Sequence, residues 1–342
     1  MQVGKRYSFI RTIKWTRNHI IIFILLGSFP VLLYHTFGIE WAHIPWQPIS
    51  LIGIAVAFYL GFKNNSSYER LWEARKIWGG VVNASRSFAA MSRDFINGDL
   101  ADEKPSDQEL LRLRKQVIHR HVAWLHCLTF ELRKPKTWEH NGKRENEIRK
   151  GLNLNYRPEQ FDKLKTYLSE ENFQYVMSKS NRSAHILSTQ SKQLMELRKS
   201  GLIDHFRHLE LQRMLTEFYA LQGKSERIKN FPFPRQYATV NYFFVILFIV
   251  LLPFGMLDVF IRLGSEYWVW WAVPSSVVGS WVFWVMELVG DYSENPFEGL
   301  FNDVPISTIA NGIEIDIREM LDETALPKPL EPIAIDTLNI AT

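Results

Sequence analysis

The sequence has very little cysteine and none of the common catalytic signatures. Cys127 is the single cysteine in 342 residues, which excludes an internal disulfide framework and a zinc site built on cysteines. The HExxH zinc motif, the Walker phosphate loop, GxGxxG and GxSxG are all missing. We therefore expect no enzyme, no cofactor and no metal centre.

Charge is also missing from four long stretches of the chain. No Lys, Arg, Asp or Glu occurs in residues 19–38, 44–62, 238–257 and 267–286. A helix that crosses the hydrocarbon core of a bilayer needs roughly 20 mostly apolar residues. Aromatic residues make up 14% of the sequence and gather in these stretches and at their borders. The pattern predicts a multi-pass membrane protein with four transmembrane helices. A signal peptide is a weaker reading of the first stretch, because no Ala-x-Ala-like site follows it.

Basic residues are distributed unevenly, and their distribution predicts the orientation. The first 18 residues carry five of them and no acids, at Lys5, Arg6, Arg11, Lys14 and Arg17. Residues 63–236 carry 32 Lys and Arg against 21 Asp and Glu, an excess of 11 positive charges. Because basic segments stay on the cytoplasmic side, we expect both termini and residues 63–236 to lie in the cytoplasm, with the spans in the inner (plasma) membrane.

These patterns divide the chain into five parts. We expect a cytoplasmic N-terminal segment (1–18), two transmembrane helices (19–62), a cytoplasmic helical region (63–236), two further transmembrane helices (237–287) and an acidic cytoplasmic tail (288–342). From Glu287 onward there are 12 acidic and 2 basic residues, so the tail is expected to pack on the basic region, or else to be disordered.

The middle region has helical periodicity and no period-2 run long enough for a sheet. Apolar residues at steps of three and four form one stripe, which comprises Leu110, Leu113, Val117, His121, Trp124 and Leu128. The predicted fold class is therefore all-α, with four transmembrane helices that extend into a cytoplasmic helical bundle.

The second span carries one line of bulky apolar residues, at Ile54, Phe58 and Phe62. Their spacing of four places them along one side of a helix. If several copies of the helix surrounded an axis, these side chains would form stacked hydrophobic rings, and such constrictions gate pores by dewetting. The alternative is that the stripe faces lipid or a neighbouring helix.

A second line of small residues lies one position behind, at Gly53, Ala57 and Gly61. Small residues at this spacing allow helices to approach closely inside a membrane. We expect this line to be a helix-packing surface.

Two segments resemble a known family. Residues 60–79 read LGFKNNSSYERLWEARKIWG, and residues 294–297 read ENPF, followed by Asn302, Asp303 and Pro305. Both resemble the signature of the bacterial bestrophins, and the four-span layout extends the resemblance over nearly the whole chain. The motif positions are Asn64, Asn65, Tyr68, Arg70, Trp72, Glu73, Asn295, Pro296 and Phe297.

The resemblance implies a homopentamer in the lipid bilayer, with a central pore lined by the second span. It places the narrow neck at Ile54, Phe58 and Phe62, and a second constriction near Ile203 and Phe206. It favours permeant anions such as chloride, and a basic vestibule would raise their local concentration. A cation-conducting channel of the same fold, and a non-conducting scaffold that binds a cytoplasmic partner, remain the alternatives. Nucleic acid is not an expected partner, because the basic region is interspersed with acids.

The chain departs from the family pattern at two places. Leu71 stands between Arg70 and Trp72, where the family usually has a tryptophan. The animal members have an acidic calcium clasp just after Asn-Pro-Phe, whereas here only Glu298 and Asp303 follow. Calcium prefers six to eight oxygen ligands, so gating through such a clasp is not expected.

Overall fold

The structure is a computed structural model, and it describes residues 1–4, 8–264, 266–335 and 338–342. Lys5 and Arg6 of the basic N-terminal segment lie outside the described residues. The described chain is almost entirely helical, which confirms the all-α prediction. Its contacts divide it into two compact units. We call residues 4–70 and 232–294 the span unit, and residues 1–3, 71–231 and 295–342 the bundle unit.

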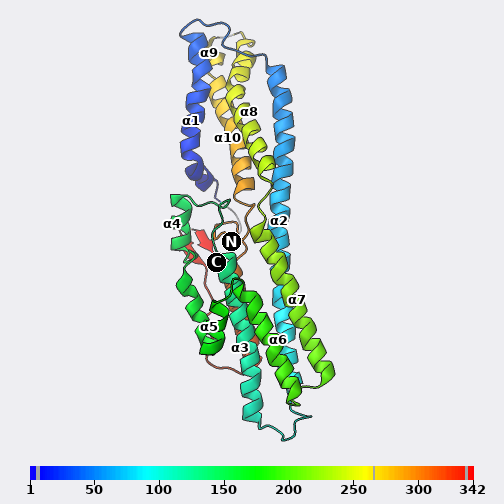
Figure 1. Ribbon diagram of the computed structural model, residues 1–342. Coiled ribbons are helices and arrows are strands. Elements are labelled where there is room, and N and C mark those ends of the chain that lie inside the picture. Colours follow the sequence, from blue (N-terminus) through cyan, green and yellow to red (C-terminus); the bar gives the residue numbers. More distant parts are fainter. Residues whose placement is uncertain (5–7, 265, 336–337) are drawn as a thin grey trace. The chain divides into compact units, whose positions relative to one another are not determined.

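The span unit contains the four helices that are long and apolar enough to cross a membrane. They are α1 (Phe9–His35), the first half of α2 (Trp46–Phe95), α8 (Arg235–Ile261), and the short α9 (Glu266–Val269) together with α10 (Ala272–Asp291). α1, α8 and α10 pack against one another (Figure 1). Buried side chains from the four spans form one core, which includes Phe23, Ile49, Leu60, Phe248 and Trp284.

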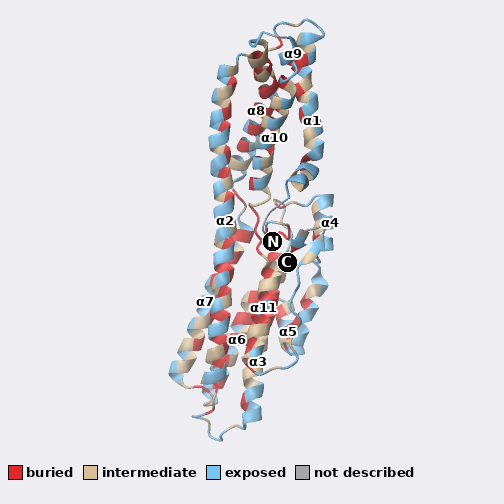
Figure 2. Cartoon of the chain, turned by 180° about the vertical axis from the view of Figure 1, so that it is seen from behind, coloured by how far each residue is buried: buried red, intermediate tan, exposed pale blue. Residues whose placement is uncertain are grey.

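The bundle unit is built from shorter helices around α3 (Asp107–Leu132). They are α4 (Lys143–Gly151), the 3₁₀ helix η1 (Pro158–Thr166), α5 (Glu170–Met177), α6 (Arg182–Lys199), α7 (His205–Asn230) and α11 (Ile306–Glu319). Two short antiparallel strands, β1 (Ile333–Ile335) and β2 (Leu338–Ile340), follow α11. Buried residues are concentrated along α3 and the face of α11 that packs on it (Figure 2). The largest side chains of this core include Trp78, Phe88, Trp124, Phe218 and Phe297.

The helix starts of the bundle unit are specified by local sequence. Ser106, Ser169, Asn181 and Asp204 each precede a helix, and each side chain accepts a hydrogen bond from a backbone N–H of the first turn. Such caps satisfy donors that have no partner within the helix, and each stabilises a helix by about 1 kcal/mol.

The acidic C-terminal segment packs on the basic helices within the bundle unit. The carboxylate of Asp303 binds Arg133, the C-cap of α3, at 2.8 Å, and Glu314 of α11 binds His126 of α3 at 2.7 Å. Asp316 of α11 pairs with Arg86. The excess of negative charge in this segment is therefore placed against positive side chains from distant parts of the sequence.

Candidate functional site

The bulky stripe of α2 lies on the outside of the span unit. Ile54, Phe58 and Phe62 are 69%, 67% and 51% exposed, although all three are large and apolar. The rings of Phe58 and Phe62 contact edge to face, with centroids 4.6 Å apart. The same face continues into the polar residues Asn65 and Glu69, which are linked by a hydrogen bond of 3.0 Å. One side of the helix thus passes from an apolar to a polar surface, and no described part of this chain covers it.

The small stripe of α2 is divided between two environments. Gly53 is buried against α8, and a Cβ atom there would lie 2.6 Å from the ring of Phe248. Ala57 and Gly61 are exposed, and nothing in the described chain lies within 4 Å of a Cβ atom at Gly61. Gly53 therefore permits packing inside the chain, whereas Ala57 and Gly61 leave space beside the bulky stripe.

A buried ion pair follows the bulky stripe directly. Lys63, the residue after Phe62, is 1% exposed and its ammonium donates a hydrogen bond to Glu287 of α10. Asn241 of α8 donates to the other carboxylate oxygen at 2.5 Å. Three helices of the span unit are therefore joined at one point. In the sequence, Lys63 and Glu287 directly follow the uncharged stretches 44–62 and 267–286, and no motif pairs them. The available signal was the presence of opposite charges at the ends of two spans, since ionisable groups in such places usually have partners.

The two signature segments meet in the span unit. Arg70 donates through Nε to the backbone oxygen of Glu294 at 2.6 Å, and the carboxylate of Glu294 accepts from Arg235 at 2.5 Å. Asn64 lies against Gly290, where any larger side chain would collide with it. The conformation of the first signature is therefore fixed by the segment that begins the second.

The remaining motif positions have different surroundings. Tyr68 and Trp72 are 58% and 45% exposed, whereas Asn295 and Phe297 are buried. The backbone oxygen of Pro296 accepts a hydrogen bond from Val304 at 3.0 Å, and Glu73 pairs with Arg227 in the bundle unit. The buried members hold the loop after residue 294 in place, and the exposed aromatic members lie on the surface of the chain.

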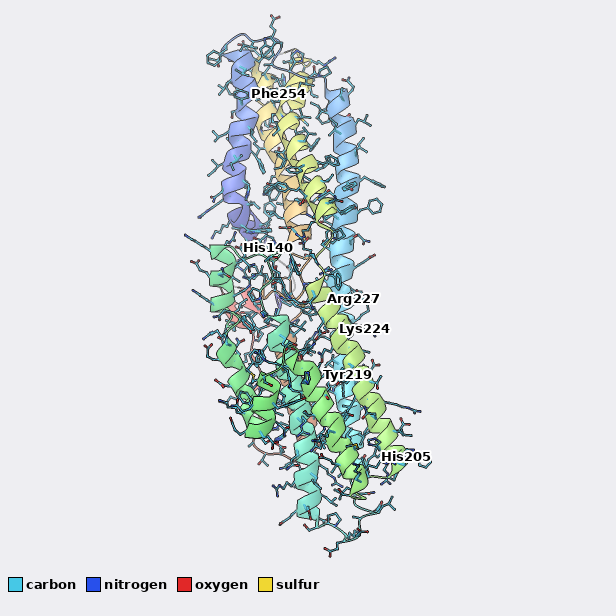
Figure 3. All side chains as sticks on the ribbon, viewed as in Figure 1. His140, His205, Tyr219, Lys224, Arg227 and Phe254 are labelled. Atoms are coloured by element: carbon cyan, nitrogen blue, oxygen red, sulfur yellow. The ribbon has the colours of Figure 1, made fainter. Side chains whose placement is uncertain are left out.

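The residues expected near a second constriction differ in exposure. Ile203 is 1% exposed and belongs to the core of the bundle unit, whereas Phe206 is 79% exposed at the start of α7. Asp204 caps this helix by accepting from the backbone N–H groups of Phe206 and Arg207. Figure 3 shows the neighbouring His205 at the free end of α7. Of the expected pair, only Phe206 has an exposed side chain, so only Phe206 is available to line a second constriction.

Comparison with known proteins identifies the family. Residues 11–319 match the family described as bacterial/fungal bestrophin protein. The chain belongs to the bestrophins. It is 29% identical over 285 residues to the voltage-dependent anion channel-forming protein YneE of Escherichia coli K12, covering 83% of this chain and 80% of that protein. Protein RSc3414 of Ralstonia nicotianae, which bears the same description, is 28% identical over 293 residues, covering 83% of each chain.

Solved structures share the fold. A bacterial bestrophin homologue from Klebsiella pneumoniae superposes with a TM-score of 0.72 and 24% sequence identity, covering 89% of this chain and 97% of that one. The resemblance drawn from the two signatures is thus confirmed, and the helical architecture is that of a bestrophin.

The two carboxylates after Phe297 already have basic partners in this bestrophin. Glu298 accepts from the ring and the backbone N–H of His140 at 3.0 and 3.1 Å. Burial raises the pKa of Glu298 to about 7, although the hydrogen bond from His140 opposes the rise. Asp303 binds Arg133 at 2.8 Å and also accepts from the backbone N–H of Gly299. In the described part of the chain, no group of three or more His, Cys, Asp or Glu side chains is placed to hold a metal ion.

Proposed function

We propose that this bestrophin is an anion channel, assembled as a cyclic homopentamer around a pore lined by α2. The exposure of Ile54, Phe58 and Phe62 on one face of a membrane-length helix carries the proposal. The names of the relatives support anions as the permeant ions, because YneE and RSc3414 are described as anion channel-forming proteins.

The apolar face suits a narrow neck. Rings of Ile and Phe offer no hydrogen bonds, so water leaves a tight passage between them, and an ion inside loses hydration without compensation. The same face continues into Asn65 and Glu69 where the predicted span ends, so an ion leaving the neck would meet polar side chains. Lys63, Glu287 and Asn241 would hold the neck helix against α8 and α10.

The proposal also covers the orientation of the protein in the membrane, the second constriction, the principal ion and the contact between subunits. Both termini and the bundle unit would be cytoplasmic in the plasma membrane, as the basic residues indicate. Phe206 would face the cytoplasmic part of the pore, and chloride would be the principal ion. Ala57 and Gly61 would receive the neighbouring subunit, since both are exposed next to the neck residues.

Recording from purified protein in planar bilayers under a KCl gradient tests the function. An anion channel gives a reversal potential close to the equilibrium potential of chloride. A reversal near the equilibrium potential of potassium would establish the cation-conducting alternative, and a lack of current from correctly folded protein would favour a scaffold.

A further inference from the structure

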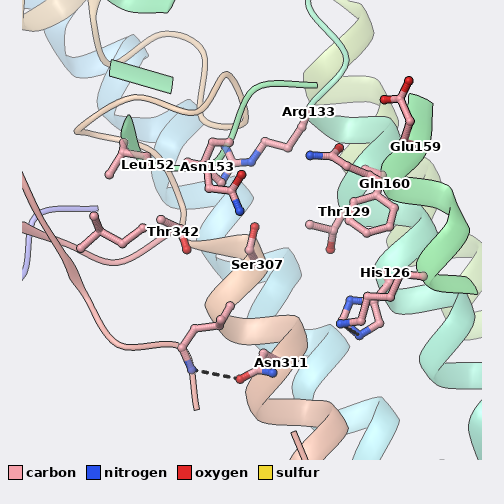
Figure 4. A pocket seen from close by; sticks show the side chains of 15 residues that line it. His126, Thr129, Arg133, Leu152, Asn153, Glu159, Gln160, Ser307, Asn311 and Thr342 are labelled. Carbon is pink, nitrogen blue, oxygen red and sulfur yellow. Dashed lines mark hydrogen bonds between the residues drawn. The ribbon is translucent and has the colours of Figure 1, made fainter. Parts of the chain in front are cut away.

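A cavity of about 440 Å³ lies within the bundle unit, and its lining includes none of the residues of the proposed pore. Five segments that are distant in the sequence surround it: α3, the loop after α4, η1, α11 and the C-terminal stretch (Figure 4). Its volume falls in the lower part of the range of small-molecule sites.

Two lining residues offer hydrogen-bond donors, Arg133 and Asn311, and they lie at opposite ends of the cavity in Figure 4. Arg133 is 5% exposed and uses its two terminal nitrogens on Asp303 at 2.8 Å and on the backbone oxygen of Val304 at 3.4 Å. Its Nε is buried and has no partner in the described chain. Asn311 accepts a hydrogen bond from the backbone N–H of Leu330 at 3.1 Å (dashed in Figure 4), which leaves its amide N–H groups as donors. A buried donor without an acceptor costs free energy, so the lining favours acceptor groups in the cavity.

Lys163 of η1 adds a positive charge to the lining of the cavity. Its ammonium lies 3.0 Å from the ring of His126 and 3.7 Å from the nearer carboxylate oxygen of Glu314. Glu314 has closer partners, since it accepts from Tyr167 at 2.6 Å and from Arg318 at 2.9 Å. Burial would raise the pKa of Glu314, but hydrogen bonds from His126 and Tyr167 lower it to about 2. Glu314 thus has closer partners than Lys163, and the Lys163 side chain is 42% exposed, so its ammonium can also contact a ligand in the cavity.

The cavity also has an apolar wall. Phe130, Leu152, Leu154, Leu330 and Ile333 line it. The carboxylate among the lining residues, Glu159, lies on the exposed side of η1. An inorganic anion would use the donors but would leave the apolar wall against water, whereas a neutral apolar molecule would leave the donors unpaired.

We propose that this cavity binds a small organic carboxylate, with its carboxylate at Lys163 and Asn311 and its apolar body against Phe130 and Leu330. The ligand would link α3, η1 and α11 to the C-terminal stretch. The site lies inside one bundle unit, so it requires neither the pore nor the pentamer.

Isothermal titration of the full-length protein in detergent with phenylacetate tests the proposal, with phenylacetamide and inorganic phosphate as comparison probes. We expect saturable binding of one phenylacetate per chain, and binding at least about tenfold weaker for each comparison probe. Lys163→Gln should weaken phenylacetate binding by a similar factor through loss of the charge. Ser307→Phe, which fills the cavity from α11, should abolish it. Lys165→Gln is the matched control, because this exposed lysine on the same short helix pairs with Asp162 outside the cavity, and it should leave binding unchanged.

Each contrary result removes a specific part of the proposal. The absence of saturable binding to a wild-type protein that melts normally would overturn the site. Equal binding of phenylacetamide would overturn the carboxylate, and equal binding of phosphate would overturn the apolar body. Undiminished binding to a folded Ser307→Phe or Lys163→Gln variant would show that the ligand lies elsewhere. None of these results depends on conduction, so the channel function is tested separately.

Discussion

Lys63 and Glu287 show how much one residue pair contributes to the stability of the span unit. Both side chains are buried, so each neutralises a charge that would otherwise be isolated from water. Removing one partner of a buried pair typically costs about 3–5 kcal/mol, because the other charge is left uncompensated. We predict that Lys63→Met lowers the melting temperature of the detergent-solubilised protein strongly, whereas the double variant Lys63→Met/Glu287→Met is less destabilised than either single variant.

The control for this cycle is the exposed pair Arg213–Glu210, whose disruption should leave the melting temperature almost unchanged. If the effects of the two buried substitutions simply add, the two charges do not depend on each other and the pair does not join the helices.

Glu131 gives a pH dependence at the residue scale. Burial raises its pKa from 4.5 to about 7, although backbone N–H groups of Arg182 and Ser183 donate to the carboxylate and oppose the rise. Between these two pH values the folded state holds a proton that the unfolded state has released. Stability therefore falls as pH rises through this window.

We predict that Glu131→Gln removes this part of the decline, so that its melting temperature drops less than that of the wild type between pH 5 and pH 8. Glu171→Gln, at an exposed position of α5, should retain the full decline. If the melting temperature of Glu131→Gln falls between pH 5 and pH 8 as much as that of the wild type, other groups account for the decline.

At the scale of elements, α2 was the most predictable helix and also shows the limit of prediction. An uncharged stretch and a continuing helical pattern were sufficient to predict a helix that runs beyond the span, and α2 ends only at Phe95. The orientation of its small stripe was not predictable from spacing. Four residues turn a helix by more than one full rotation, so positions four apart drift around the axis. Gly53 consequently faces α8, while Ala57 and Gly61 face outward.

The pairing of charged residues was also not predictable from the sequence. Lys63 and Glu287 are 224 residues apart, and nothing local to either position indicates the other. The same holds for the cavity in the bundle unit, because its lining comes from α3, η1, α11 and the C-terminal stretch and is assembled only in the folded chain. By contrast, the caps of α3, α5, α6 and α7 and the two bestrophin signatures each consist of residues close together in the chain. Such features can be recognised in a single sequence.

The segment after Phe297 leads to a prediction about calcium. Its carboxylates, Glu298 and Asp303, are occupied by His140 and Arg133, and their geometry offers calcium too few oxygen ligands. We predict that currents of the reconstituted protein are the same in micromolar calcium and in chelator. Steep activation by calcium would reveal a site outside this segment.

At the scale of the whole molecule, the account requires five copies of the chain. A closed ring provides an axis for the exposed face of α2 and a neighbour for Ala57 and Gly61. We predict a homopentamer as the dominant species in native mass spectrometry from detergent. A monomer or dimer as the sole species would remove the pore, although the four-helix span unit would be unaffected.

The identity of the neck is the central claim, and single-channel conductance of a triple variant tests it most directly. Replacing Ile54, Phe58 and Phe62 together with Ala should widen and wet the passage, because the smaller side chains no longer exclude water. A matched control replaces Leu25, Phe29 and Leu32 of α1 with Ala, since these side chains are also large, apolar and exposed.

The account predicts that the α2 variant remains pentameric, conducts markedly more current than the parent and closes for shorter periods, while the α1 variant conducts like the parent. A pentameric α2 variant whose conductance and gating match those of the parent would contradict it, and α2 would then not line the neck.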